Sequence, residues 1–393
     1  MRLLVVLYAG DYREAYDRMK RGQSETYHGH RYALNTLIGI GKQVEEVAVL
    51  CCYCQEPYNE LAEPGFRVIG TGFSFGQPAT GLIPFVEAQA PTHLVIRSPT
   101  KPLLQWAIKK QIPTLVLLAD SFNGRSLKDR LKNYLLARLL NHSCIDWVGN
   151  HGINACKSLV AIGVNPHKIV PWDWPHQVTP EQFPAKKLPA NADFWKLTYV
   201  GSVSEAKGVG DIIEAVALLR AKGIEAKLKI AGKGKLKEFE ERAIALGIQD
   251  NVSFLGLVPH DSIVDLMRSA DFVIVPSRHD YPEGLPLTIY EGLCSRTPII
   301  ASDHPMFLGN LVHRKSAMIY PAGQVEGIVT SIETLISEAS LYEEISAQSE
   351  QTWQNLQIPV KSGDFISKWL LSSDAGKDWL SNYSIAARKY SNA

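Results

Sequence analysis

Two glutamates that follow a short apolar run are the first residues of the sequence that could do chemistry. The run 272–275 is typical of a buried strand, and Glu283 and Glu291 come after it with seven residues between them. A helix is expected from Leu287 onward, so Glu291 would lie about one turn into it, where its carboxylate could accept two hydroxyl hydrogen bonds from a ribose. Taken alone, both side chains are more simply explained as solvated acids near a helix start.

The loop between the two glutamates is suited to anions. Gly284 and Pro286 favour a tight turn, with the proline near the first turn of the helix. Backbone amides at a helix start have no partner within the helix and attract negative charge. Residues 284–288 could therefore hold a diphosphate.

A lysine in a glycine-rich turn is the second chemical feature. The predicted strand 197–200 leads into Gly201, then Lys207 and Gly208, and a helix is predicted for residues 212–220. A lysine at such a strand-to-helix turn can meet phosphate oxygens. A single solvated loop lysine is common, but its combination with the two glutamates is less so.

These segments together resemble the C-terminal donor domain of the retaining glycosyltransferases of family four, which have the GT-B fold. The resemblance depends on residues 201–208 and on the E-x7-E pattern of Glu283 and Glu291. It covers residues 195–325 well and the first half of the chain loosely. Three further segments are similar to the family pattern: residues 231–234, 252–256 and 291–302.

The resemblance implies a role for each matching residue. Glu291 would hold the ribose of a nucleotide sugar, Glu283 would face the donor sugar, and Lys207 would bind the diphosphate. Gly256 and Leu257 would border the base. The other residues expected at the donor are Gly201, Ser202, Gly284, Leu285, Pro286, Leu287, Arg278 and, from the first half of the chain, Gly10.

Ser202 departs from the family pattern, which usually has an arginine at this position. Three explanations are open: Lys207 and the helix amides suffice, another cation such as Arg278 or Lys233 compensates, or the phosphate is held less tightly.

Two further departures concern Arg296 and Asp120. The family commonly has a glycine where Arg296 stands, so a left-handed backbone there would carry a strain of about 1 kcal/mol. The family often has a histidine after the fifth strand of its first domain, where this sequence reads Leu117-Leu118-Ala119-Asp120. Asp120 is thus the candidate catalytic residue on the acceptor side.

The elements that must position these residues alternate along the chain. Short apolar runs and helical patterns predict parallel α/β sheets, and therefore a GT-B architecture of two Rossmann-like domains with parallel sheets facing across an interdomain cleft. The cleft is the expected active site. We expect an acceptor-side domain at 1–171, a proline-rich linker at 172–190, a donor-binding domain at 191–361, and an amphipathic helix at 362–393 that packs across the domains.

Composition excludes several classes of protein. With 393 residues, 41 basic and 40 acidic side chains and a net charge of +1, the chain lacks the basic excess of a duplex-DNA binder, so no nucleic acid partner is expected. Its six cysteines have no disulfide or metal spacing, and no run is long enough for a leader or a membrane span. We expect a reduced, cytoplasmic protein. No D-x-D pair occurs, so we expect no metal.

The resemblance implies a retaining, metal-independent hexosyltransferase. Its donor would be a nucleotide-diphosphate sugar, with UDP-glucose the first guess, and no other cofactor is expected. The acceptor would be a saccharide or a lipid-linked saccharide, in polysaccharide or glycolipid synthesis. A non-catalytic sugar-nucleotide-binding protein and a sugar-nucleotide epimerase of the same fold remain open. A nicotinamide dehydrogenase is weakly supported, because Ile213 replaces the third glycine of G-x-G-x-x-G.

A basic region could add a membrane contact. Residues 97–142 contain nine lysines or arginines against Asp120 and Asp129, and a helix is predicted at 126–142. Such a helix can lie on an anionic membrane surface, which would make the protein peripheral at the inner face, or it can be a solvated helix face.

Overall fold

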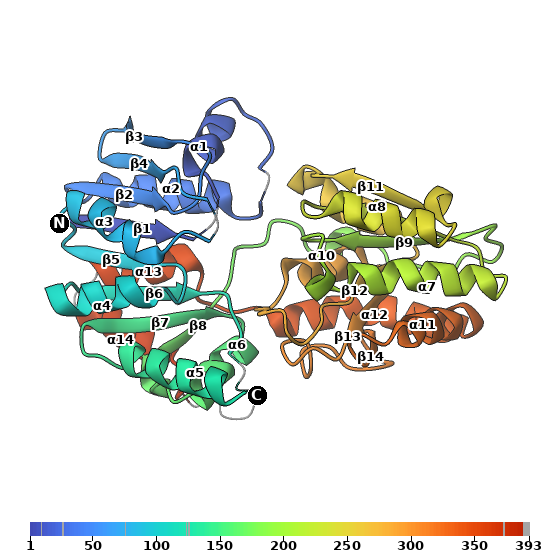
Figure 1. Ribbon diagram of the computed structural model, residues 1–393. Helices are drawn as coiled ribbons and strands as arrows, with labels where there is room; N and C mark the ends of the chain where they lie inside the picture. The colour runs from blue at the N-terminus through green and yellow to red at the C-terminus, as the bar shows by residue number, and fades with distance from the viewer. Residues whose placement is uncertain are drawn as a thin grey trace. The chain divides into compact units, whose positions relative to one another are not determined.

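The computed structural model describes residues 1–387 except 9, 26, 75, 123, 125, 372 and 373. They form two compact α/β units (Figure 1). The first unit contains Met1–Pro175 together with the segment from Ile358 onward, and the second contains His176–Gln357. Each is described by itself.

The first unit is built on an eight-stranded sheet in the order β3-β4-β2-β1-β5-β6-β7-β8. Every neighbouring pair is parallel except β3 and β4. The strands are β1 (Arg2–Leu7), β2 (Glu46–Cys51), β3 (Pro57–Glu63), β4 (Phe66–Thr71), β5 (His93–Ile96), β6 (Thr114–Leu118), β7 (Ile145–His151) and β8 (Ile169–Trp172).

Helices cover both faces of this sheet, which explains why its central strands are apolar throughout (Figure 1). The helices are α1 (Tyr12–Lys20), α2 (His30–Gly41), α3 (Ile83–Ala88), α4 (Lys101–Lys110), α5 (Leu127–Leu140), α6 (Ile153–Ala161), α13 (Ser362–Leu371) and α14 (Asp374–Asn382).

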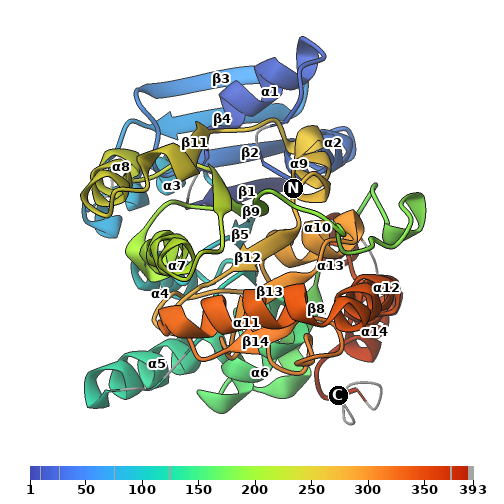
Figure 2. The ribbon, with the colours of Figure 1, turned by 90° about the vertical axis from the view of Figure 1, so that its right-hand side faces the viewer.

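The second unit has a six-stranded, wholly parallel sheet in the order β11-β10-β9-β12-β13-β14. Helices α7, α8 and α11 lie on one face of it, and α9, α10 and α12 on the other (Figure 2). The strands are β9 (Trp195–Val200), β10 (Ala226–Ala231), β11 (Val252–Gly256), β12 (Phe272–Val275), β13 (Ile299–Ser302) and β14 (Met318–Tyr320); the helices are α7 (Val209–Ala221), α8 (Leu236–Ala245), α9 (Ile263–Arg268), α10 (Leu287–Ser295), α11 (Val325–Ser337) and α12 (Ala339–Leu356).

Both sheets have a topological switch point. In the first, the chain runs outward from β1 to β2 and then returns to β5 on the other side of β1. In the second, β9 and β12 have the same relation. Ligands of open α/β sheets bind outside the carboxyl ends of the strands at such points. The loops after β9 and β12 are therefore the place to look for the donor site.

The predicted fold class is confirmed, and the details differ at two places. The polar strand β3 was not predicted, because its largely exposed residues lack an apolar run. The segment expected as one helix packed across the domains forms α13 and α14, and both belong to the first unit. Trp369 on α13 donates to Asp146 Oδ2 over 2.8 Å, and the amide of Gly363 donates to the Tyr32 hydroxyl over 3.2 Å. Residues 388–393 of the expected helix lie outside the described part of the chain.

Candidate active site

Glycines close the carboxyl ends of β9, β10 and β11. Gly201 donates its N–H to the carbonyl of Ala231 over 2.9 Å, and Gly232 donates to the carbonyl of Gly256 over 2.8 Å. A Cβ atom on Gly232 would lie 1.8 Å from the carbonyl oxygen of Gly201. These contacts explain the glycine turns that the sequence shows at both positions.

Lys207 and Glu283 form an ion pair between the loops that follow β9 and β12. Lys207 ends a short turn, η4 (Glu205–Lys207), and its ammonium donates to Glu283 Oε1. The two side chains are only 12% and 7% exposed, so water screens their charges little. Gly208, which begins α7 at φ 71°, fixes this approach, because a Cβ there would lie 2.3 Å from the carbonyl oxygen of Pro276.

Residues that the sequence did not single out hold this pair. The Ser277 hydroxyl donates to Glu283 Oε1 over 2.6 Å, and the Ser302 hydroxyl donates to the carbonyl of Ser277 over 2.6 Å. The Tyr281 ring centroid lies 4.4 Å from Lys207 Nζ, a cation–π contact. His304 Nε2 lies 3.1 Å from the Tyr281 carbonyl oxygen, and burial lowers the pKa of His304.

The start of α10 faces the end of β9. Pro286 precedes the helix, as predicted, and as the N-cap residue it supplies no side-chain hydrogen bond to the first turn. The Thr288 hydroxyl donates to the carbonyl of Val200 over 3.2 Å, which ties the first turn of α10 to the last residue of β9. The open end of α10 therefore belongs to the same edge of the sheet as Lys207.

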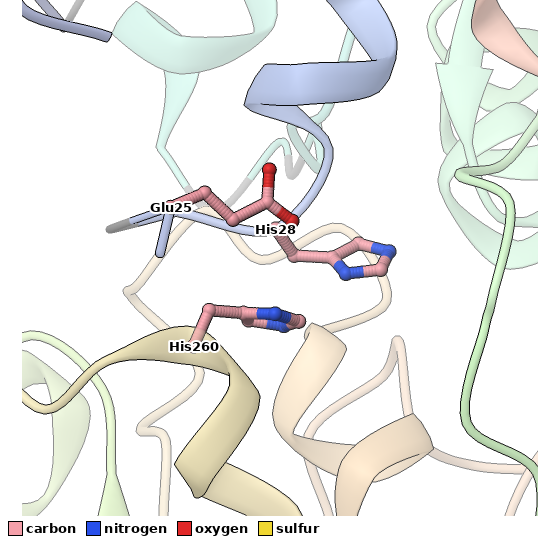
Figure 3. A group of neighbouring side chains, drawn as sticks. All are labelled: Glu25, His28 and His260. Carbon is pink, nitrogen blue, oxygen red and sulfur yellow. The ribbon is translucent and has the colours of Figure 1, made fainter. Parts of the chain in front are cut away.

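Glu291 lies one turn into α10 and contacts a histidine. His260 Nε2 is 3.0 Å from Glu291 Oε1, within hydrogen-bond distance, and the Glu291 side chain is 15% exposed. His260 begins the turn η6 (His260–Ser262) ahead of α9. Figure 3 shows His260 on this turn, and also Glu25 and His28, which come from the segment before α2 of the first unit.

Arg278 is engaged elsewhere. Its guanidinium pairs bidentately with the buried carboxylate of Asp211, on α7, and lies 2.8 Å from Glu205 Oε1. Arg242 of α8 donates to Glu205 Oε2 over 3.1 Å and also pairs with Glu214. Arg278 is thus part of an ion-pair network with Asp211 and Glu205. These pairs argue against the explanation that Arg278 compensates for the arginine that the family usually has at the position of Ser202.

The other predicted donor residues lie along the same strand ends and loop. Ser202 is exposed, and its carbonyl accepts a hydrogen bond from the Tyr199 hydroxyl over 2.7 Å. Gly256 has φ 64°, and Leu257 is exposed beside it. Gly284 and Leu285 are buried under the loop, and Leu287 is the first residue of α10. Lys233 is exposed.

Arg296 has the left-handed backbone that the sequence suggested. Its φ is 59° at the end of α10. The strained residue is held by two bonds: its guanidinium lies 2.8 Å from Glu350 Oε2, and the Ser346 hydroxyl donates to its carbonyl over 2.6 Å. These contacts offset the strain of about 1 kcal/mol.

Asp120 and Gly10 belong to the first unit. Asp120 follows β6; its amide donates to Asn150 Oδ1 over 3.3 Å, and its carbonyl accepts from Asn150 Nδ2 over 2.8 Å. Burial raises the pKa of Asp120 to about 6. Gly10, at φ 98°, lies between β1 and α1. Neither residue belongs to the unit that contains Lys207 and Glu283.

The architecture defines the class of the protein: it has the GT-B fold. The sucrose-phosphate synthase of Thermosynechococcus elongatus superposes with a TM-score of 0.67 at 15% identity, covering 91% of this chain and 94% of that one. The Anabaena protein HepE, in complex with UDP-glucose, superposes with a TM-score of 0.63 at 15% identity, covering 91% and 95%.

The sequence comparison gives the family of the second unit. Residues 181–352 match the glycosyl transferases group 1 family, which confirms that this segment resembles glycosyltransferases. The alpha-D-kanosaminyltransferase of Streptomyces kanamyceticus is 28% identical over 149 residues, 38% of each chain. The chain matches between 38% and 43% of the length of such curated relatives.

Proposed function

We propose that the protein is a retaining glycosyltransferase that moves a hexose from a nucleotide-diphosphate sugar to a saccharide or lipid-linked saccharide. The observation that carries this proposal is the buried Lys207–Glu283 pair at the switch point of the second sheet, beside the uncapped start of α10. The membership of residues 181–352 in a glycosyltransferase family supports it.

The pair supplies the charges that sugar transfer needs. When the bond between the anomeric carbon and the diphosphate breaks, negative charge grows on the diphosphate and positive charge on the sugar ring. The Lys207 ammonium and the backbone amides at the start of α10 stabilise the negative charge on the diphosphate. The Glu283 carboxylate stabilises the positive charge on the sugar ring. Before the donor binds, Lys207 and Glu283 neutralise each other, and Ser277 keeps Glu283 in place when the ammonium turns to the phosphate.

The nucleotide end of the donor fits the remaining residues. Glu291 would accept hydrogen bonds from the ribose, in place of its contact with His260, and the backbone of Gly256 and Leu257 would border the base. Lysine and helix amides provide the positive charge, so we expect transfer without a metal ion.

We expect a UDP-hexose to bind, with UDP-glucose as the first candidate because HepE is described with that molecule. A ligand at ~100 times its dissociation constant stabilises a protein by about 2.7 kcal/mol. Thermal unfolding in the presence of UDP-, GDP- and ADP-sugars should thus show a rise in Tm of several degrees for one nucleotide. A Tm unchanged by all three classes would contradict the donor site.

The fate of the donor distinguishes the proposed transferase from two alternatives, a non-catalytic binder and an epimerase. The exposed Ser202, where the family usually has a cation, would suit a non-catalytic binder. A transferase should slowly release free sugar and UDP from the donor without an acceptor, and the Glu283→Ala variant should not. A binder releases neither, and an epimerase changes the sugar while it stays attached to the nucleotide.

We also propose that α5 rests on an anionic membrane surface, where a lipid-linked acceptor would be found. Four large apolar side chains of this helix are exposed: Leu127 at 84%, Leu131 at 60%, Tyr134 at 56% and Leu135 at 43%. Their spacing places them on one face, and the opposite face of α5, with Leu136 and Leu140, is buried in the first unit.

Basic side chains flank this exposed apolar stripe. Successive residues of a helix are 100° apart around its axis. By this step, Lys128 and Lys132 lie beside one edge of the apolar stripe and Arg130 lies beside the other. Each cation near an anionic leaflet contributes about 1 kcal/mol, and the apolar side chains can enter the headgroup region. No helix among the described residues is long and apolar enough to span a membrane, so α5 would lie in the surface.

Replacing Leu127 and Leu131 by serine should abolish most binding to vesicles that contain phosphatidylglycerol. The reason is the loss of two exposed apolar side chains from the stripe. Co-sedimentation measures it, and Leu61→Ser is the matched control, since Leu61 is 56% exposed on β3. Binding that salt does not weaken, or equal binding by all variants, would rule out this surface.

A further inference from the structure

Arg97 is a partly buried cation with no counter-ion among the residues that the structure describes. It follows β5, and its guanidinium carbon lies 4.8 Å from the ring centroid of Trp172 and 5.4 Å from that of Trp174. With the residues that the structure describes, its side chain makes no hydrogen bond and no ion pair. Burial lowers the pKa of Arg97, with the hydroxyls of Tyr12 and Tyr27 as its opposing influences. A desolvated charge of this kind is costly unless an anion joins it.

The two tryptophans fix the guanidinium. Both are almost fully buried, and they meet edge to face with centroids 5.3 Å apart. The Trp172 indole donates to the carbonyl of Leu118 over 3.0 Å, so its ring cannot turn away. A guanidinium in cation–π contact with aromatic rings still has its N–H groups available for a carboxylate or a phosphate.

A small cavity opens beside Arg97. Its polar wall contains Arg97, Tyr12 and Thr36, and the first residues of α13, Ser362 and Gly363; the rest of the wall is apolar. All these residues belong to the first unit. Tyr12 begins α1 after β1, and Arg97 follows β5, so the cavity lies at the switch point of the first sheet.

The carboxylate between the two tryptophans in sequence, Asp173, already has other partners. Asp173 is fully buried. It lies 3.0 Å from His151 Nε2, accepts the amide hydrogen of Trp174 over 2.8 Å, and lies 3.5 Å from Lys361 Nζ. Among the described residues, Lys361 rather than Arg97 is therefore the cation that pairs with Asp173.

We propose that this cavity binds an anionic group, a phosphate or a carboxylate, that the acceptor substrate carries, with Arg97 as its main ligand. The proposal that the cavity binds an anion does not depend on the proposed function. The proposal that the acceptor carries this anion does depend on the proposed function. Tyr12 and Thr36 would offer hydroxyl hydrogen bonds, and the apolar walls would exclude water from the ion pair.

Binding of inorganic phosphate and of acetate tests the cavity. The full chain with Lys207→Ala is used, so that the donor site does not contribute. Calorimetry should show saturable binding of one of the two anions, and adding Arg97→Met should weaken it about tenfold or more. Lys110→Met, which removes an exposed charge from the same unit, is the control and should leave binding unchanged. No saturable binding, or equal binding after Arg97→Met, would overturn the proposal.

A second variant guards against misfolding. Arg97→Lys keeps a cation over the tryptophans but loses the fork, so it should bind the anion several-fold more weakly while its Tm stays that of the parent. If Arg97 served only to pack against the tryptophans, Arg97→Lys would change Tm or nothing at all, and anion binding would be unaffected.

The acceptor assignment is tested with pairs of saccharide acceptors that differ in one phosphate or one carboxylate. Arg97→Met should raise KM about tenfold for the charged member, leave kcat near the parent value, and leave both constants unchanged for the neutral member. If Arg97→Met weakened UDP binding to the same extent, the anion would belong to the donor, and its assignment to the acceptor would be wrong. Absence of transfer to every acceptor would refute the proposed function and leave the phosphate result standing.

Discussion

Replacing Lys207 by methionine will lower sugar transfer by about 10- to 150-fold or more, because a charge-assisted hydrogen bond to the leaving diphosphate contributes about 1.5–3 kcal/mol. The same change leaves Glu283 buried without its cation, with Ser277 as the remaining side-chain donor among the described residues. Breaking a buried pair in this way costs about 3–5 kcal/mol of unfolding free energy. Initial rates of UDP release from the proposed donor and thermal unfolding measure the two effects.

The second unit contains a matched control for Lys207. Lys222 and Glu333 form an ion pair over 2.7 Å with side chains 52% and 34% exposed. An exposed pair contributes little, so Lys222→Met should change the unfolding free energy by less than about 1 kcal/mol and leave transfer intact. Near-parent transfer by Lys207→Met would remove Lys207 from the site.

Replacing Glu283 by glutamine will lower transfer by about 100-fold or more, because the neutral amide cannot oppose the positive charge that develops on the sugar ring. The substitution conserves shape and allows the Ser277 hydroxyl to keep a partner. The donor should still bind, since Lys207 loses its internal competitor and turns to the phosphate. The expected pattern is therefore a large fall in kcat with a similar or lower KM.

Two comparisons make the Glu283 result specific. Glu333→Gln removes an exposed carboxylate of the same unit and should behave like the parent. The double variant Lys207→Met/Glu283→Gln removes both buried charges, so it should recover much of the stability that Lys207→Met loses and recover none of the transfer. Transfer restored in the double variant would mean that the pair only stabilises the fold.

Local features of the sequence were the most predictable. Gly232 marks a strand end because a Cβ there would lie 1.8 Å from the carbonyl oxygen of Gly201, and Gly256 marks another because its φ is 64°; both requirements show in the sequence as glycines. The start of α10 was predictable from Pro286, whereas the left-handed backbone at Arg296 was suggested only by the glycine that the resembled family commonly has there. A residue type that a backbone position requires is visible in the sequence, even where the contact that requires it comes from elsewhere in the chain.

Contacts between distant residues were not predictable. The sequence made Arg278 a candidate phosphate ligand. In the structure its guanidinium pairs with Asp211, 67 residues away. His260 gave no sign that it would meet Glu291, 31 residues later. Arg97 was only one of nine cations in a basic region, and its isolation depends on Trp172 and Trp174, which follow a different strand.

The assignment of the chain's last residues shows the same limit. Residues 362–371 are amphipathic, and the pattern could not say which surface their apolar face would cover. In the structure α13 joins the first unit, with Gly363 against Tyr32 and Trp369 against Asp146. The acceptor-side role of Asp120 stays a prediction.

Glu205 and Lys207 lie two residues apart in the turn η4. The Glu205 carboxylate forms ion pairs with Arg242 of α8 and with Arg278 of the loop after β12. The ammonium that would meet the donor is therefore positioned in advance, and the donor need not spend binding energy on ordering the turn. At the proposed donor site, α8 would then influence through Arg242 how firmly a phosphate is held. Engineering that helix offers a way to tune donor affinity while every residue in contact with the nucleotide stays as it is.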